Sequence, residues 1–233
     1  MIEFLKSLLF VRKCLFCGEV LTDSREDVFC PKCRLEYEKL KRQMCRICGK
    51  PHMLCGCMPK SVYGRISHAV HLFAYGDPQS KILIFSLKRR DYKPLQHFLG
   101  LELAERLGEL SDYAITYAPR KPKSVREYGF DQAKTLARAI AEEKGIPFVE
   151  IFSHAHFSKL QKELGAEARV ENAEKSYRLR KHFVRECENL IIIDDVMTTG
   201  STMATLASLA KEAGYGRIVV ACVALTTYEK ETL

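Results

Sequence analysis

The residues best suited to chemistry lie in the stretch 189–202, which reads NLIIIDDVMTTGST. Its aliphatic run Leu190–Ile193 predicts a strand buried on both faces of a parallel sheet, because apolar residues do not alternate there with polar ones. Asp194 and Asp195 then fall at the carboxyl end of that strand. Open α/β sheets bind their ligands at this edge, so the two carboxylates are candidate ligand-binding groups.

The turn after these carboxylates predicts an anion site. Its residues are short enough for several backbone N–H groups to point at one anion; they are Thr198, Thr199, Gly200, Ser201 and Thr202. A helix predicted over about 203–213 adds the positive end of its dipole. A phosphate would bind in the turn, and the two carboxylates would accept hydrogen bonds from ribose hydroxyls. The alternative is an ordinary strand, turn and helix in which Asp and Thr only cap. The sequence has neither a Walker A loop nor a dinucleotide fingerprint, which disfavours nucleoside triphosphates and dinucleotides.

Eight of the ten cysteines lie before residue 58, in two sets with the spacing of zinc knuckles. The first set is Cys14, Cys17, Cys30 and Cys33, and the second is Cys45, Cys48, Cys55 and Cys57. Two cysteines two residues apart present both sulfurs on one side of a tight turn, as tetrahedral Zn²⁺ requires. Since no export signal is recognised, we predict two structural Zn²⁺ ions rather than disulfides, with the metal supplying much of the folding free energy.

The spacing leaves some ligands open. Sequential pairing, with one ion for each set, is preferred, but a crossed pairing uses the same residues. His52 could replace a cysteine of the second set, and the thiolates could hold an Fe–S cluster instead. Cys187 and Cys222 are predicted to be buried free thiols.

Length and composition predict one full domain with a small satellite, since the chain has 233 residues of which 47% are hydrophobic. We place the boundary after residue 60. Residues 1–60 then form a double zinc-ribbon domain with a short amino-terminal helix, and residues 61–233 form the larger domain. No apolar stretch approaches the roughly 20 residues that span a bilayer, so we expect a cytoplasmic protein. The formal charge of +8 falls to about +4 when eight thiolates bind two Zn²⁺ ions, which makes net charge weak evidence for a nucleic-acid partner.

Strands and helices alternate along the larger domain. The predicted strands cover 66–75, 113–118, 148–152, 190–193 and 218–225, and the predicted helices cover 80–88, 95–107, 132–144 and 203–213. This alternation predicts a doubly wound parallel α/β sheet. We expect His68 and His71, in the first strand, to be half-buried or surface histidines rather than metal ligands.

Local basic clusters indicate a second kind of ligand. Lys88, Arg89, Arg90 and Lys93 surround Tyr92, and a second basic segment, 120–126, precedes Tyr128. Cations that contact phosphates and aromatic faces that stack on bases would together bind single-stranded DNA. The alternatives are that these segments serve only the anion site, or that they are solvated faces.

The segment 194–202, DDVMTTGST, resembles the 5-phosphoribosyl-1-diphosphate (PRPP) motif of type I phosphoribosyltransferases. In that family the acidic pair holds the ribose hydroxyls and the following loop holds the 5′-phosphate, commonly with Mg²⁺. The resemblance implies a type I phosphoribosyltransferase-like fold that binds PRPP and Mg²⁺. It also implies a diphosphate loop after the second strand, formed by Pro119, Arg120, Lys121 and Arg126.

A second resemblance narrows the family. The pattern of Arg126, Gly129, Phe130, Gln132 and Ala133 resembles a signature of ComF-type proteins, which are related to bacterial DNA uptake. Gln161 with Arg169-x-x-Asn172 and the paired cysteine knuckles resemble further elements of that family. Tyr128 and Asp131 depart from it, since the family usually has Arg and Asn there, and each change makes the presumed diphosphate site less positive.

The resemblance implies a PRPP-binding protein of ComF type that takes part in DNA uptake or natural transformation. Its partners would be single-stranded DNA and other DNA-uptake proteins. Two alternatives remain: an active phosphoribosyltransferase of nucleotide salvage or metabolism with an unidentified acceptor, and a zinc-ribbon adaptor that senses PRPP. No catalytic residue is assigned, because glycosyl transfer from PRPP depends on positioning and on neutralising the leaving group rather than on a dedicated base.

Overall fold

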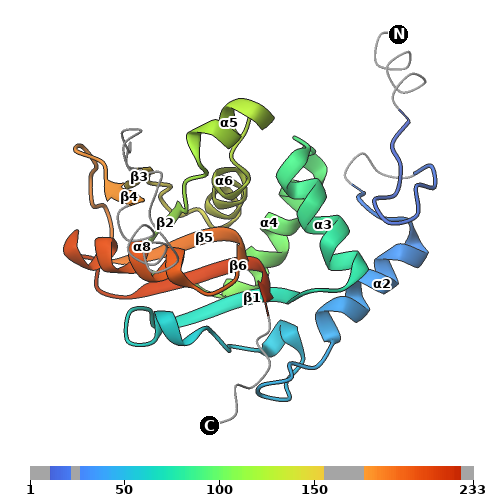
Figure 1. Cartoon of the computed structure of the whole chain (residues 1–233), viewed down its shortest axis with the longest axis horizontal. Helices are drawn as coiled ribbons and strands as arrows, with labels where there is room; N and C mark the ends of the chain where they lie inside the picture. The colour runs from blue at the N-terminus through green and yellow to red at the C-terminus, as the bar shows by residue number, and fades with distance from the viewer. Residues whose placement is uncertain (1–10, 22–26, 155–175, 227–233) are drawn as a thin grey trace, which may run out of the picture.

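The computed structural model describes residues 11–21, 27–154 and 176–226. Its centre is a four-stranded sheet in the order β1-β6-β5-β2 (Figure 1). The strands are β1 (His68–Tyr75), β2 (Tyr113–Tyr117), β5 (Asn189–Met197) and β6 (Ile218–Thr226). Every neighbouring pair in this sheet is parallel, as the alternation of strands and helices predicts.

Helices cover both faces of the sheet. Among the described residues, the α-helices are α2 (Pro31–Arg42), α3 (Pro78–Arg89), α4 (Lys93–Leu107), α5 (Pro122–Tyr128), α6 (Gln132–Lys144) and α8 (Ser201–Glu212). Two short 3₁₀ turns, η1 (His52–Leu54) and η2 (Lys60–Val62), precede the sheet. One core joins α3, α4 and α6 to one face of the sheet, and a second core joins α8 and η2 to the other (Figure 1). The aliphatic β5 therefore serves two cores, which is why its apolar residues do not alternate with polar ones.

Local signals fix the helix ends. α6 begins and ends at the predicted residues, because the Asp131 side chain caps its first turn and Gly145 ends it in the left-handed conformation. α3 and α4 each begin two residues before the predicted start, with a proline in the first turn, a position that tolerates the missing N–H of proline.

Two predictions in the middle of the chain are wrong. Residues 148–152 do not form a strand of the central sheet; Phe148 makes a single parallel bridge to Ile115. Instead, β3 (Phe152–His154) pairs antiparallel with β4 (Tyr177–Leu179) in a separate two-stranded sheet. The predicted basic loop is largely the short helix α5, which starts at Pro122 and ends at Gly129 with a left-handed φ of +81°.

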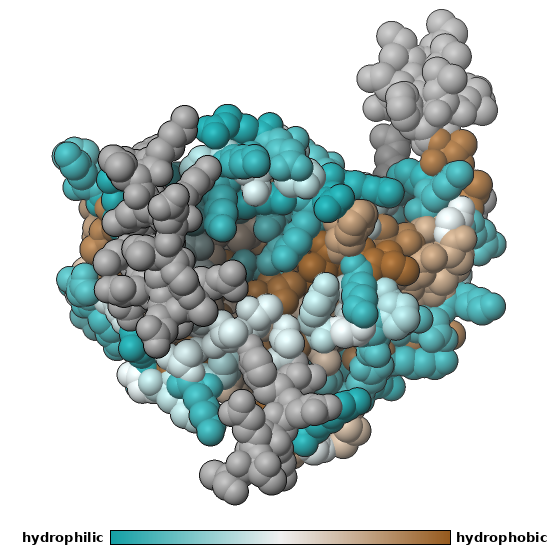
Figure 2. All heavy atoms as spheres, in the orientation of Figure 1, coloured by the Kyte–Doolittle hydropathy of each residue, from teal (hydrophilic) through white to brown (hydrophobic). Residues whose placement is uncertain are grey.

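The cysteine-containing segment packs on the larger domain. Its helix α2, which the cysteine spacing does not indicate, places Tyr37 in the same core as α4 and the sheet. Tyr37 and Lys41 both donate to the carboxylate of Glu102 on α4. Within the described residues, no helix is long and apolar enough to cross a membrane. Figure 2 shows a mostly hydrophilic face with a band of hydrophobic residues across its centre.

Candidate functional site

The two adjacent carboxylates of β5 face opposite sides of the sheet. The strand continues through Asp194 and Asp195 to Met197, and successive side chains of a strand alternate between faces. Ile193 belongs to the core under α3, α4 and α6, and Ile192 belongs to the core under α8. Asp195 therefore lies on the first side and Asp194 on the second, rather than side by side.

Asp195 is buried and held by two other elements. Its Oδ2 accepts a hydrogen bond from Nε2 of Gln132 on α6 at 2.9 Å and lies 3.5 Å from Nζ of Lys88 on α3. Lys88, which the sequence groups with a candidate DNA-binding cluster, thus also contacts the predicted ribose site. Oε1 of Gln132 is buried and has no hydrogen-bond partner among the described residues, so one acceptor remains next to Asp195.

Asp194 is half-buried and faces β4 and the start of α8. Its Oδ1 accepts the backbone N–H of Asp195 at 2.8 Å. Burial, and then the neighbouring charge of Asp195, raise the pKa of Asp194 well above its usual value. Burial, and then the charge of Asp194, raise the pKa of Tyr177 to about 12, while a hydrogen bond with Thr202 opposes that shift. The raised pKa means that the charged form of this carboxyl is disfavoured, and a nearby cation or hydrogen-bond donor would stabilise that form.

The turn predicted to bind phosphate is exposed at its first two residues and leads directly into α8. Thr198 and Thr199 are exposed, and Gly200 caps α8 in the left-handed conformation with a φ of +76°. The hydroxyls of Thr199 and Ser201 lie 3.0 Å apart. α8 has twelve residues, enough for an appreciable helix dipole at this end. A turn of small residues at a helix amino terminus is an arrangement that binds anions.

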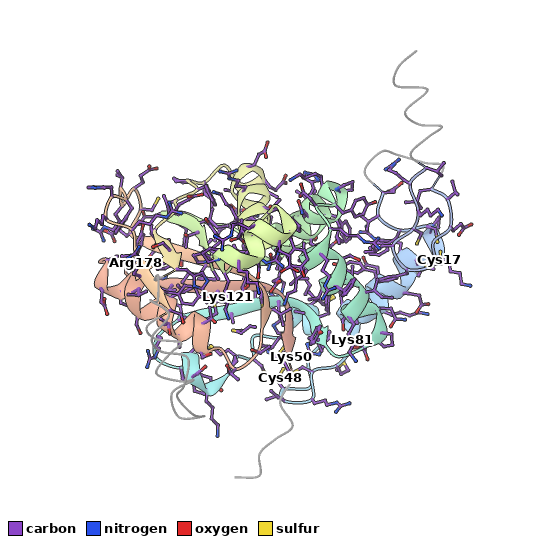
Figure 3. The ribbon with its side chains drawn as sticks, turned by 45° about the horizontal axis from the view of Figure 1, so that its top comes forward. Cys17, Cys48, Lys50, Lys81, Lys121 and Arg178 are labelled. Carbon is purple, nitrogen blue, oxygen red and sulfur yellow. The ribbon has the colours of Figure 1, made fainter. Side chains whose placement is uncertain are left out.

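The segment after β2 runs beside this site, because Ala118 donates its N–H to the carbonyl of Ile193 at 2.9 Å. Pro119, Arg120 and Lys121 follow, and Lys121 lies near the middle of the molecule in Figure 3. Arg126 lies in the last turn of α5, at the other end of that helix from Lys121. Three of the predicted diphosphate residues therefore directly follow the contact with β5, and the fourth lies further along the chain in α5.

The two residues that depart from the ComF-type signature, Tyr128 and Asp131, both contact Arg120. Its guanidinium carbon lies 4.5 Å from the centre of the Tyr128 ring and 5.8 Å from that of Phe130, distances typical of cation–π contacts. Oδ2 of Asp131 accepts the backbone N–H of Arg120 at 2.7 Å, while Oδ1 accepts the N–H groups of Ala133 and Lys134 at the start of α6. Burial raises the pKa of Asp131. Tyr128 and Asp131 therefore fix the position of a cation, an effect that a count of charges does not reveal.

The eight amino-terminal cysteines form two separate clusters. Within each predicted set the sulfur atoms lie within 4.8 Å of one another. Cys17 Sγ and Cys30 Sγ are 3.7 Å apart, and Cys48 Sγ and Cys55 Sγ are 3.6 Å apart. A tetrahedron of sulfurs with Zn–S bonds of about 2.3 Å has edges of about 3.8 Å. The clusters therefore fit Zn²⁺, the pairing is sequential rather than crossed, and Figure 3 shows Cys17 and Cys48 far apart.

A buried histidine pair lies next to the second cluster. His52 and His71 are both buried, and Nδ1 of His52 lies 3.1 Å from Nε2 of His71. The prediction that His71 is half-buried or exposed is therefore wrong, because η1 packs against β1 and covers it. Burial, and then the proximity of His52, lower the pKa of His71 to about 3, so the ring is neutral. The four cysteines of the second set supply four ligands by themselves, so this site does not require His52 as a ligand. His68 is exposed, as predicted.

The remaining predicted residues lie in several separate places rather than in one cluster. Arg89 stacks over Phe85 at 4.7 Å, and Lys93 pairs with Asp91 at 2.9 Å. Arg89 and Arg90 are exposed at the end of α3. Cys222 is buried as predicted, whereas Cys187 is only half-buried. Gln161, Arg169, Asn172 and the predicted amino-terminal helix up to residue 10 lie outside the described residues.

Comparisons with known proteins bear on both parts of the chain. Residues 5–65 match the double zinc ribbon domain family. Over an alignment of 222 residues the chain is 24% identical to Competence protein ComFC of Streptococcus pneumoniae (strain ATCC BAA-255 / R6), covering 87% of this chain and 94% of that protein. The chain is therefore similar to a competence protein along nearly all of its length. The match extends through nearly all of both chains, and so includes the sheet as well as the ribbon.

Solved structures with some similarity to this chain include two phosphoribosyl-related enzymes and an enzyme of purine biosynthesis. The allosteric regulatory enzyme of purine biosynthesis has a TM-score of 0.39 at 16% identity, over 55% of this chain and 25% of that chain. The glutamine PRPP amidotransferase of B. subtilis has a TM-score of 0.38 at 17% identity, over the same shares of the two chains. A hypoxanthine phosphoribosyltransferase from Staphylococcus aureus has a TM-score of 0.36 at 12% identity, over 64% of this chain and 77% of that chain. The chain thus spans a quarter of the length of the first two structures. The predicted fold class, a parallel α/β sheet preceded by a zinc-ribbon module, is confirmed by the strand pairing and the ribbon match.

Proposed function

We propose that this protein is of ComF type, binds PRPP with Mg²⁺ and takes part in DNA uptake. The observation that carries the proposal is the turn 198–201, exposed at Thr198 and Thr199, which opens α8 beside the half-buried carboxylate of Asp194. The turn supplies backbone donors for a 5′-phosphate, and Asp194 supplies an acceptor for a ribose hydroxyl. The match to a competence protein over 87% of this chain supports the role in DNA uptake.

Each neighbouring residue then has a defined task. Lys88 and Gln132 hold the carboxylate of Asp195 in place. Arg120, held by Tyr128 and Asp131, and Lys121 neutralise the diphosphate. Carboxylate oxygens suit Mg²⁺, and this ion would supply charge neutralisation of the diphosphate when bound. Asp194 is the residue that fits it, because a cation would offset the cost of ionising this carboxyl.

The test is PRPP binding measured by calorimetry with and without Mg²⁺, together with product analysis using a panel of bases. Asp194→Asn removes a charge-assisted hydrogen bond of about 1.5–3 kcal/mol, so we expect affinity to fall at least tenfold. Thr202→Ala is a further check on the turn. An unchanged affinity in Asp194→Asn would contradict ribose recognition by this residue, and product formation would favour the alternative of an active phosphoribosyltransferase.

Single-stranded DNA binding is the second part of the proposal. Arg89 and Arg90 are exposed at the end of α3, the helix whose Lys88 reaches Asp195, so a strand could lie across this end of the site. Each phosphate contact gives a slope of about −0.7 in log affinity against log salt. Replacing both arginines by glutamate should therefore flatten the slope by about 1.4 or more. DNA binding that is undetectable at about 50 mM salt would exclude this part and leave the PRPP site untouched.

A further inference from the structure

The segment that follows the second cysteine cluster contacts the phosphate turn directly. Ser61 donates its hydroxyl hydrogen to the backbone carbonyl of Thr199 at 2.6 Å. On the same side, a Cβ atom added to Gly200 would lie 2.6 Å from Ser61 Oγ and 3.1 Å from Cβ of Pro59. Pro59 and Ser61 thus lie in close contact with the backbone of the turn, although they are 138 or more residues away in the chain.

This contact can orient a donor for the ligand. The peptide bond between Thr199 and Gly200 is planar, and in the trans form its C=O and N–H point in opposite directions. Holding the carbonyl of Thr199 on Ser61 therefore holds the N–H of Gly200 pointing away from Ser61. A donor that is oriented before the ligand arrives loses less entropy on binding.

The second metal cluster holds this segment at its other end. Pro59 follows Cys57 by two residues, and Cys57 donates its backbone N–H to the sulfur of Cys55 at 3.3 Å. Arg106 of α4 donates to the carbonyl of Cys55 at 3.0 Å. After η2, Arg65 donates to the hydroxyl of Ser208 on α8 at 2.7 Å. The short segment between the cluster and α8 is thus fixed on both sides.

The first metal cluster makes different contacts. Phe29, beside Cys30, packs edge-on against Phe98 of α4 at 5.6 Å. Arg34, one residue after Cys33, lies 3.4 Å from Glu102. Among the described residues, these contacts join the first cluster to α4 and leave the turn at Gly200 to the second cluster. The two clusters therefore form a matched pair for comparison.

We propose that Ser61 is a positioning residue for the anion-binding turn, and that the second zinc site sets its position. Loss of metal from Cys45, Cys48, Cys55 and Cys57 then weakens the affinity for a sugar phosphate, more than loss of metal from the first set does. This inference rests on the proposed function for its ligand. The structural part, which is that Ser61 and the second zinc site order the turn, can be tested without any ligand.

The first test compares Ser61→Ala, Ser61→Thr and Ser208→Ala. Ser208→Ala is the control, because it removes a hydrogen bond between the same segment and α8 that does not touch the turn. Hydrogen exchange of the amides in residues 198–202 should be faster in Ser61→Ala and unchanged in Ser208→Ala. The dissociation constant for PRPP should rise about three- to tenfold in Ser61→Ala, as expected for one lost neutral hydrogen bond, and Ser61→Thr should restore much of it.

The second test compares Cys57→Ser with Cys17→Ser, each with its zinc content measured. We expect each variant to lose about one zinc ion, and Cys57→Ser to show the faster amide exchange in the turn and the larger loss of PRPP affinity. Equal effects of the two variants, or unchanged exchange in Ser61→Ala, would overturn the inference. If the parent protein does not bind PRPP, the proposed function fails, while the exchange measurements still decide whether Ser61 and the second zinc site order the turn.

Discussion

Alanine at position 200 should destabilise the protein much more than alanine at position 145. Both glycines have a left-handed backbone, with φ of +76° at Gly200 and +63° at Gly145. A Cβ at Gly145 would meet nothing within 4 Å, whereas a Cβ at Gly200 would lie 2.6 Å from Ser61 Oγ and 3.1 Å from Pro59. The pair therefore separates the cost of the backbone conformation from the cost of crowding against the segment after the second cluster.

The expected magnitudes follow from these distances. A left-handed conformation destabilises a non-glycine residue by about 1–2 kcal/mol. Alanine also reduces the conformational entropy of the unfolded chain, which stabilises the folded protein by about 0.4–1 kcal/mol. Gly145→Ala should therefore cost about 1 kcal/mol. Crowding adds about 1–3 kcal/mol, so Gly200→Ala should cost about 2–4 kcal/mol in total.

The measurement is the free energy of unfolding in urea, followed by circular dichroism at constant zinc. Ser61→Ala removes the atom that the new Cβ would meet first, so the cost of Gly200→Ala should be smaller in that background by about 1 kcal/mol. The contact with Pro59 remains, so the rescue should be partial. Equal costs at positions 145 and 200, or an unchanged cost in the Ser61→Ala background, would refute the reasoning.

Three further predictions concern the metal sites and the charged groups. Freshly reduced protein should contain about two Zn²⁺ ions per chain, and Cys30→Ser should lower this by about one; metal analysis that finds a trace of zinc in the parent would contradict the assignment. The pKa of Asp194 in the folded protein is raised above 3.8, so the contribution of this residue to stability falls as pH rises through the raised pKa. Asp194→Asn should therefore raise the melting temperature at pH 7 and lower the affinity for PRPP. A lower melting temperature would argue against this. Asp131→Ala removes the α6 cap at a cost of about 1 kcal/mol of stability and frees the backbone of Arg120. The affinity for PRPP should therefore fall, and the affinity for ribose 5-phosphate, which has no diphosphate, should hardly change. An equal fall for both ligands would contradict the assignment of Arg120 to the diphosphate.

The sequence was sufficient where neighbouring residues determine the structure. Asp131 and Gly145 mark both ends of α6, the aliphatic run before Asp194 marks β5, and the spacing of Cys14 and Cys17 marks the first metal cluster. Each of these signals lies within a few residues of the feature that it predicts. The position of the phosphate turn beside the end of a central strand follows from the same kind of pattern.

Contacts between distant segments could not be predicted in this way. Residues 148–152 have the composition of a strand, yet their pairing depends on which neighbours the fold brings to them. Lys88 and Asp195 meet only because α3 and β5 pack together, and nothing near Lys88 in the chain distinguishes it from Arg89. Ser61 and His71 are similar, since their partners Thr199 and His52 become neighbours only in the folded chain.

The packing of the ribbon against β1 has a further consequence. β1 is the outermost strand of the parallel sheet, next to β6, and η1 and α2 lie against it. Tyr37 of α2 packs edge-on against Phe73 of β1 at 6.3 Å. A long apolar edge strand without a cover is a template for pairing with another chain. We therefore expect the cysteine-containing module to protect the sheet from self-association, and a chain shortened to residues 61–233 to aggregate unless β1 is given another cover.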